Sequence, residues 1–111
     1  MKKTRVKLSK IAEKVYLQLK RGKKSEKQIF ESFSKKIELV KKDIHFGEPI
    51  AKSKFLKKLK LQYNINNLFR VELPNYWRFL YALTHNADEI IVFVLAIVDH
   101  KEYNNLFGYK K

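Results

Sequence analysis

The spacing of apolar residues changes from a helical period to a period of two part-way along this chain. Apolar side chains recur at helical spacing from Leu8 to Leu19 and again from Ile29 to Ile44, as in two amphipathic helices. From residue 67 onward they alternate with polar residues, and residues 90–98 form an unbroken apolar run rich in β-branched side chains, which is typical of a buried strand. An all-α or helical-repeat fold is therefore excluded.

Local signals divide the chain further. Residues 4–8 alternate and predict a short first strand, Gly22 ends the first helix, and Ser25 with Gln28 three residues later predicts the N-cap of the second helix. The other expected segments are a break at residues 46–50, a short helix or a loop at 52–60, strands at 67–73, 76–83 and 90–98 with turns at 74–75 and 85–88, and a tail at 99–111 that is too polar for a plain strand.

This order predicts a single α+β domain, residues 1–111, in which two N-terminal helices pack on a small antiparallel β-sheet. In the strand at residues 76–83 the period of two places Trp77, Phe79 and Tyr81 on one face, which we expect to pack against the helices. The other face of the sheet is then expected to be open to a ligand.

The net charge of +14 is concentrated in residues 1–60, which hold 20 basic and 6 acidic residues, whereas the remainder holds 5 of each. Such a surplus indicates a polyanionic partner, namely nucleic acid, an acidic protein segment or an anionic membrane surface. A lysine-coated face that is merely solvated is the alternative. The charge alone does not separate these readings.

Several function classes are excluded by composition. The chain has no cysteine, which rules out disulfides, thiolate zinc sites and cysteine nucleophiles, and favours a cytoplasmic location. The longest apolar run has nine residues, about half of a membrane-spanning helix, and no signal-peptide pattern follows the basic N-terminus. Three scattered histidines and three glycines indicate neither a metal site nor a phosphate-binding glycine loop, so no cofactor is expected.

The second half of the chain resembles a known family. Four segments carry this resemblance: the stretch NLFRVELPNYWRFLYAL at residues 67–83, the apolar run after it, the DHKEY sequence at residues 99–103 and the GEPI sequence at residues 47–50. These segments are similar to the RelE/ParE toxin superfamily of type II toxin–antitoxin systems. This resemblance implies a cognate, largely acidic antitoxin. It also implies one of two targets, because RelE-like members cut mRNA on the ribosome and ParE-like members inhibit DNA gyrase.

The resemblance also implies roles for individual residues. Arg78 stands where the nuclease members carry a phosphate-clamping arginine, and Arg70 lies on the neighbouring strand. Glu48 matches the carboxylate proposed as general base in the YoeB-like branch, and His100 is the candidate general acid. The remaining candidates are Tyr103, which would pair with this histidine, and Lys101 and Tyr109, which would replace it. Glu72 departs from the basic residue typical of RelE, which argues against a RelE-type lysine site.

Further residues are expected to hold RNA without cutting it. Tyr76 and Tyr103 are candidates for stacking on unpaired bases. The lysines expected to contact the RNA backbone are Lys52, Lys54, Lys57, Lys58 and Lys60. Each candidate also has a structural alternative, such as a salt-bridged strand arginine or a solvated loop carboxylate. Three functions therefore remain open: a ribosome-dependent mRNA endoribonuclease, a gyrase inhibitor, and an RNA-binding relative without catalysis.

Overall fold

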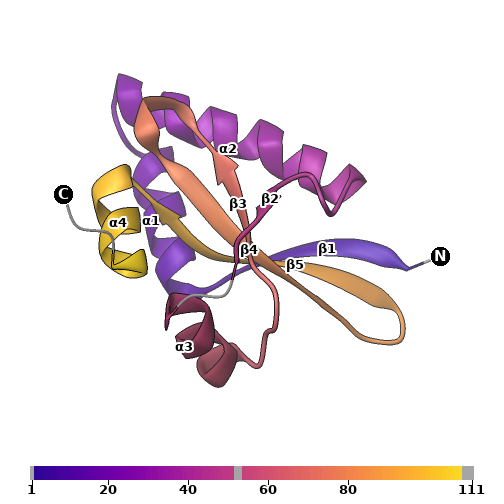
Figure 1. The fold of residues 1–111 in the computed structure, drawn as a ribbon. Helices are drawn as coiled ribbons and strands as arrows, with labels where there is room; N and C mark the ends of the chain where they lie inside the picture. Colours follow the sequence, from indigo (N-terminus) through magenta and orange to yellow (C-terminus); the bar gives the residue numbers. More distant parts are fainter. Residues whose placement is uncertain (1, 52–53, 109–111) are drawn as a thin grey trace.

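In a computed structural model that describes residues 2–51 and 54–108, a five-stranded sheet lies between two layers of helices (Figure 1). None of the helices in these residues is long and apolar enough to cross a membrane. In chain order the elements are β1 (Lys3–Leu8), α1 (Lys10–Lys20), α2 (Lys24–Lys42), β2 (Glu48–Pro49), α3 (Lys54–Tyr63), β3 (Phe69–Glu72), a 3-10 turn (Pro74–Tyr76), β4 (Arg78–His85), β5 (Glu89–Val98) and α4 (His100–Phe107).

The strand order in the sheet is β1-β5-β4-β3-β2, and β1 runs parallel to β5 while the other neighbours are antiparallel. The predicted fold class, two N-terminal helices on an antiparallel sheet, is therefore wrong. A strand precedes the helices, α3 and α4 lie later in the chain, and the sheet is mixed. The alternation at the N-terminus identifies β1 as a strand, but it carries no information about which strand β1 pairs with.

The ends of the first two helices are fixed by side-chain hydrogen bonds. The hydroxyl of Ser9 accepts from the backbone N–H of Ala12 at 3.1 Å and donates to the carbonyl of Leu95 at 2.8 Å, so it caps α1 and ties it to β5. The predicted N-cap Ser25 is wrong, because α2 begins at Lys24 and its N-cap is Lys23, two residues before the predicted one. The carboxylate of Glu26 accepts from the N–H of Lys23 at 3.3 Å.

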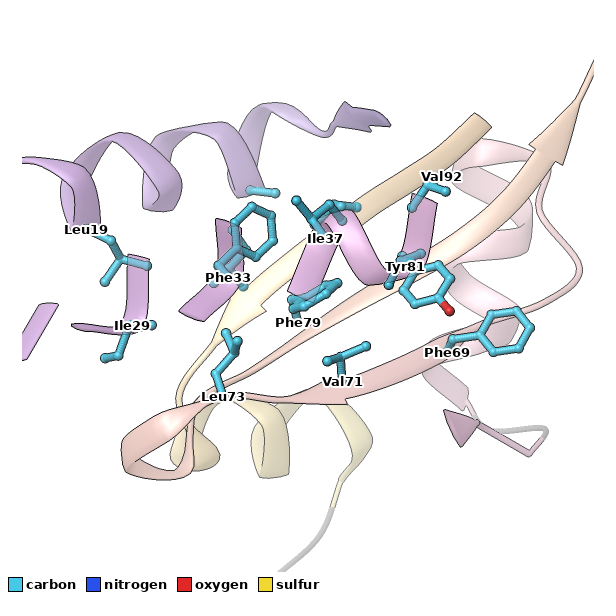
Figure 2. Packing of buried hydrophobic residues seen from close by; sticks show 14 residues of the cluster. Leu19, Ile29, Phe33, Ile37, Phe69, Val71, Leu73, Phe79, Tyr81 and Val92 are labelled. Carbon is cyan, nitrogen blue, oxygen red and sulfur yellow. The ribbon is translucent and has the colours of Figure 1, made fainter. Parts of the chain in front are cut away.

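One face of the sheet packs against α1 and α2 (Figure 2). The predicted inward face of the second helix is confirmed, since its residues Ile29, Phe33, Ile37 and Val40 are all buried. The ring of Phe33 meets that of Phe79 edge-on at 4.9 Å, and Tyr81 stacks on Phe69 at 5.1 Å. The predicted inward positions of β4 are thus the centre of this layer.

The opposite face of the sheet is covered by α3 and α4, so the expectation of an open face is wrong. Leu80 and Ala82 of β4 pack there against Leu59 of α3 and Tyr103 of α4. The segment at residues 52–60, for which the sequence allows a short helix or a loop, lies mostly in the helix α3, and the polar tail contains α4. Each of these two helices is amphipathic, and the apolar residues that it buries lie on the one side that faces the sheet.

Candidate functional site

The register of the strands brings charged residues together on the α4 side of the sheet. Glu72 of β3 pairs with Arg78 of β4, and Glu48 of β2 pairs with Arg70 of β3. Because alternate residues of a strand share a face, Arg70 and Glu72 point to the same side as Leu80, away from α2. We call the resulting group, Glu48, Arg70, Glu72, Arg78 and Tyr103, the arginine site.

Arg70 is held by three neighbours in the arginine site. Its Nη2 lies 3.0 Å from a carboxylate oxygen of Glu48, its Nη1 donates to the hydroxyl oxygen of Tyr103 at 3.1 Å, and its Nε lies 3.5 Å from Glu72. The hydrogen bond to Tyr103 raises the pKa of Arg70, and both carboxylates act in the same direction against the effect of burial. The guanidinium therefore stays charged.

Arg78 has fewer partners than Arg70. Its side chain is only 14 % exposed, and its nearest carboxylate oxygen belongs to Glu72 at 3.6 Å from Nη2. The guanidinium carbon lies 4.4 Å from the centre of the Tyr103 ring, in cation–π contact. Within the described part of the chain its buried Nε has no hydrogen-bond partner. Such a planar, fixed donor set matches the oxygens of a phosphate group.

Tyr103 is the platform on which the two arginines rest. It is 3 % exposed, so the expectation that its ring stacks on RNA bases is wrong. The helix that carries it is well delimited, because Asp99 accepts from the N–H of Glu102 at 2.9 Å and Gly108 ends α4 in the left-handed region at φ 72°. A capped helix fixes the position of the tyrosine ring.

The turn between β3 and β4 presents an aromatic ring beside this platform. Asn75 and Tyr76 both have positive φ, at 60° and 63°, a conformation that costs energy for residues with a Cβ atom. Tyr76 is 76 % exposed, and its ring lies edge-on to that of His100 at 6.1 Å. Of the two tyrosines expected to stack on bases, Tyr76 is the one whose ring is accessible.

His100 and Lys101, the candidates for the general acid, begin α4 and are both exposed. The ring contact with Tyr76 places His100 at the turn between β3 and β4. Tyr109, the alternative proton donor, lies outside the described residues. The structure therefore groups Glu48, Arg70, Arg78 and Tyr103 directly, whereas the contact of His100 with Tyr76 places the histidine at the turn and not in this group.

The hydroxyl group of Tyr81 holds the residues that precede Glu48 in place through two hydrogen bonds. The phenol oxygen of Tyr81 accepts from the N–H of Gly47 at 3.0 Å and donates to the carbonyl of Ile44 at 2.8 Å. Burial raises the pKa of Tyr81, so the group remains a neutral hydrogen-bond donor. A Cβ atom at Gly47 would come within 2.9 Å of the Tyr81 ring, which explains the glycine. Glu48 itself is 70 % exposed and accessible to a ligand.

Four of the lysines expected to hold RNA belong to α3, on the same side of the sheet as the arginine site. Lys57, Lys58 and Lys60 are exposed, and Lys54 is the first residue of the helix. Lys52 lies outside the described residues. The helix packs on α4, with the rings of Phe55 and Phe107 at 5.2 Å. The helix α3 therefore presents cationic side chains on the same side of the sheet as the two arginines.

A cavity of about 740 Å³ lies apart from this cluster, between α1, α3, α4 and the end of β5. Its walls are mainly apolar, and none of the five residues of the arginine site lines it. Among the residues that the structure describes, no group of three or more histidines and carboxylates is placed to hold a metal ion.

Glu72 is the residue of this site whose position sequence reasoning missed. The resemblance marks it only as a departure from a basic residue, yet its carboxylate lies between both arginines. Glu72 and Arg78 are direct cross-strand neighbours across a loop of five residues, and this pairing depends on a turn in which Asn75 and Tyr76 have positive φ.

Comparison of the chain with protein-family models, with curated proteins and with solved structures finds no match.

Proposed function

We propose that this protein is the toxin of a type II toxin–antitoxin system of the RelE/ParE superfamily, and that it acts as an endoribonuclease on mRNA in the ribosome. The observation that carries the proposal is Arg78, a largely buried guanidinium that lies on Tyr103 beside Arg70 and whose buried Nε has no hydrogen-bond partner among residues 2–51 and 54–108. A fixed pair of arginines on adjacent strands is suited to binding an RNA phosphate.

Attack of the RNA 2′-hydroxyl on the neighbouring phosphorus places negative charge on the phosphate oxygens. Preorganised cations stabilise that charge best when they are already oriented and partly shielded from water. Arg78 meets this requirement through its contact with the Tyr103 ring, and Arg70 through its hydrogen bond to the same tyrosine. The two guanidinium groups are thus the proposed transition-state donors.

The proton transfers are assigned to the exposed groups around the arginines. Glu48, 3.0 Å from Arg70, is the proposed base that takes the 2′-hydroxyl proton. His100 is the proposed acid for the leaving 5′-oxygen, because imidazole is the side chain that most often transfers protons in general acid–base catalysis. Lys101, next to His100 on α4, is the alternative donor. Tyr76, exposed beside His100, would hold a base of the substrate by stacking.

The basic residues outside the arginine site account for the proposed partners. Exposed lysines on α3 would contact the backbone of ribosomal RNA or mRNA, which adds affinity that falls with salt. The same net charge of +14 suits an acidic antitoxin that covers the surface. The place of action would be the cytoplasm, where translating ribosomes are found.

Expression of the protein tests the proposal when Arg78→Ala is compared with Arg5→Ala. Arg5 pairs with Glu89 at 3.0 Å on β1, so its loss changes the net charge equally at a place remote from the arginine site. We expect growth arrest and cut mRNA from the wild type and from Arg5→Ala, and neither from Arg78→Ala. Intact mRNA together with gyrase-linked plasmid breaks would replace the proposal by gyrase inhibition. Salt-sensitive RNA binding without cleavage would indicate a non-catalytic relative.

A further inference from the structure

The carboxylate of Glu72 occupies the space between the two arginines. One oxygen lies 3.5 Å from Nε of Arg70 and the other 3.6 Å from Nη2 of Arg78, so a single carboxylate bridges both guanidinium groups. Charge-assisted hydrogen bonds between such groups are usually about 2.7–2.9 Å long. The bridge is therefore loose, and it leaves the buried Nε atoms of both arginines without a hydrogen bond among the described residues.

A phosphate group has the same requirements as this carboxylate. Both present two oxygens to a guanidinium fork, and both need the positive charge of the arginines. With Glu48 and Glu72 in place, the charges of the two arginines are balanced by two carboxylates. An RNA phosphate that binds both arginines would have to displace Glu72 or bind beside a like charge.

The surroundings of Glu72 allow its side chain to leave without a change of the backbone. The side chain is 54 % exposed, so water can receive the carboxylate. The backbone is held in place independently, because the strand pairs with Arg78 and the carbonyl of Glu72 accepts from the ammonium group of Lys36. Movement is therefore confined to the side-chain torsions.

We propose that Glu72 is a competing carboxylate, which occupies the phosphate position of the arginine site in the free protein and turns out to solvent when RNA binds. The inference rests on the proposed function, since it takes the two arginines as the phosphate site. Glu72 then lowers the affinity of the two arginines for any phosphate group that must displace it. Isolated phosphates compete poorly with it, whereas an RNA strand that is also held by the α3 lysines and by Tyr76 displaces it.

The test is the binding of a fluorescently labelled, 2′-O-methylated single-stranded RNA, which cannot be cut by 2′-hydroxyl attack, to the full chain. Glu72→Gln should bind about fivefold more tightly than the wild type, the size of one partly exposed charge interaction. The matched control is Glu89→Gln, which changes net charge equally at the Arg5 pair and should shift affinity by less than about twofold. Glu72→Ala should act like Glu72→Gln, which excludes a new contact by the amide.

The variants also distinguish a failure of this inference from a failure of the proposed function. If Arg78→Ala weakens binding but Glu72→Gln matches Glu89→Gln or binds less tightly than the wild type, Glu72 is not a competitor and the phosphate site stands. If Arg78→Ala binds as the wild type does, the arginines are not the phosphate site, and both the proposed function and this inference fail. In the Arg78→Ala background, the gain from Glu72→Gln should fall below twofold.

Discussion

Substitution of Tyr81 by phenylalanine isolates the hydrogen bonds that fasten the Glu48 loop to the core. The ring is fully buried and would remain in place, so packing against Phe69 is retained. The carbonyl of Ile44 and the N–H of Gly47 would lose their partner, at 2.8 and 3.0 Å. Buried backbone groups left without a hydrogen bond destabilise a protein by about 1–3 kcal/mol, and we expect about 2 kcal/mol here.

Thermal unfolding followed by circular dichroism measures this loss. An unfolding entropy of about 2.1 cal/mol/K per residue gives roughly 0.23 kcal/mol per degree for 111 residues. The midpoint of Tyr81→Phe should therefore lie about 9 °C below that of the wild type. Tyr76→Phe removes the same atom from an exposed ring and should change the midpoint by less than about 2 °C.

The pH dependence gives a second readout of the same group. The pKa of Tyr81 is raised above its ordinary value of 10.0 in the folded protein, mainly by burial. The folded state thus holds the phenol proton more tightly than the unfolded state does, so this stabilisation is complete below about pH 10 and is lost as pH rises through the folded pKa. The difference in unfolding midpoint between the wild type and Tyr81→Phe should therefore become smaller as the pH rises above about 10. A midpoint of Tyr81→Phe within 2 °C of the wild type at pH 7 would refute the reasoning.

Three further substitutions test other parts of the fold and the site. Gly47→Ala places a Cβ atom 2.9 Å from the Tyr81 ring and should lower the free energy of unfolding by about 1–3 kcal/mol in urea titrations; an unchanged midpoint would contradict the close approach. Ser9→Ala removes the cap of α1 and the bond to Leu95, with an expected loss of about 1–2 kcal/mol in the same assay. Tyr76→Asn relieves an aromatic residue at positive φ and should raise the melting midpoint by about 2 °C, while RNA binding weakens about tenfold; equal RNA affinity would remove Tyr76 from the binding surface.

The period of the apolar residues predicted the parts of the fold in which each element buries one stripe. In β4 the alternation correctly separated Phe79 and Tyr81, which face α2, from Leu80 and Ala82, which face α4. The buried side of α2 followed in the same way. These predictions succeed because burial depends on residues close together in the sequence.

The parts that failed depend on contacts between distant segments. The pairing of β1 with β5 joins residues more than 80 positions apart, and no local pattern specifies it. The second helical layer escaped prediction because α3 and α4 are short and carry many polar side chains, so their few apolar residues did not identify a covered face. The wrong expectation that the ring of Tyr103 is accessible to RNA bases has the same cause, because α4 buries this ring.

The candidate site was predictable to the extent that the hairpin fixed it. The resemblance pointed to Arg78 and to Glu48, and Arg70 was predicted because it lies on the strand next to Arg78; the structure pairs Arg70 with Glu48. The bridging position of Glu72 required the register of the turn, which depends on the backbone angles of Asn75 and Tyr76. Positive φ at two successive residues without glycine is not a signal that sequence patterns supply.

The most direct test of the central claim is the cleavage of mRNA on purified translating ribosomes, with the chemistry of the new 3′ ends determined. We predict that the wild type and Arg5→Ala release fragments that end in a 2′,3′-cyclic phosphate, and that Arg78→Ala cuts about 10²–10³-fold more slowly. Equal cleavage by Arg78→Ala, or no cleavage by the wild type, would contradict the assignment of the arginine site to RNA cleavage.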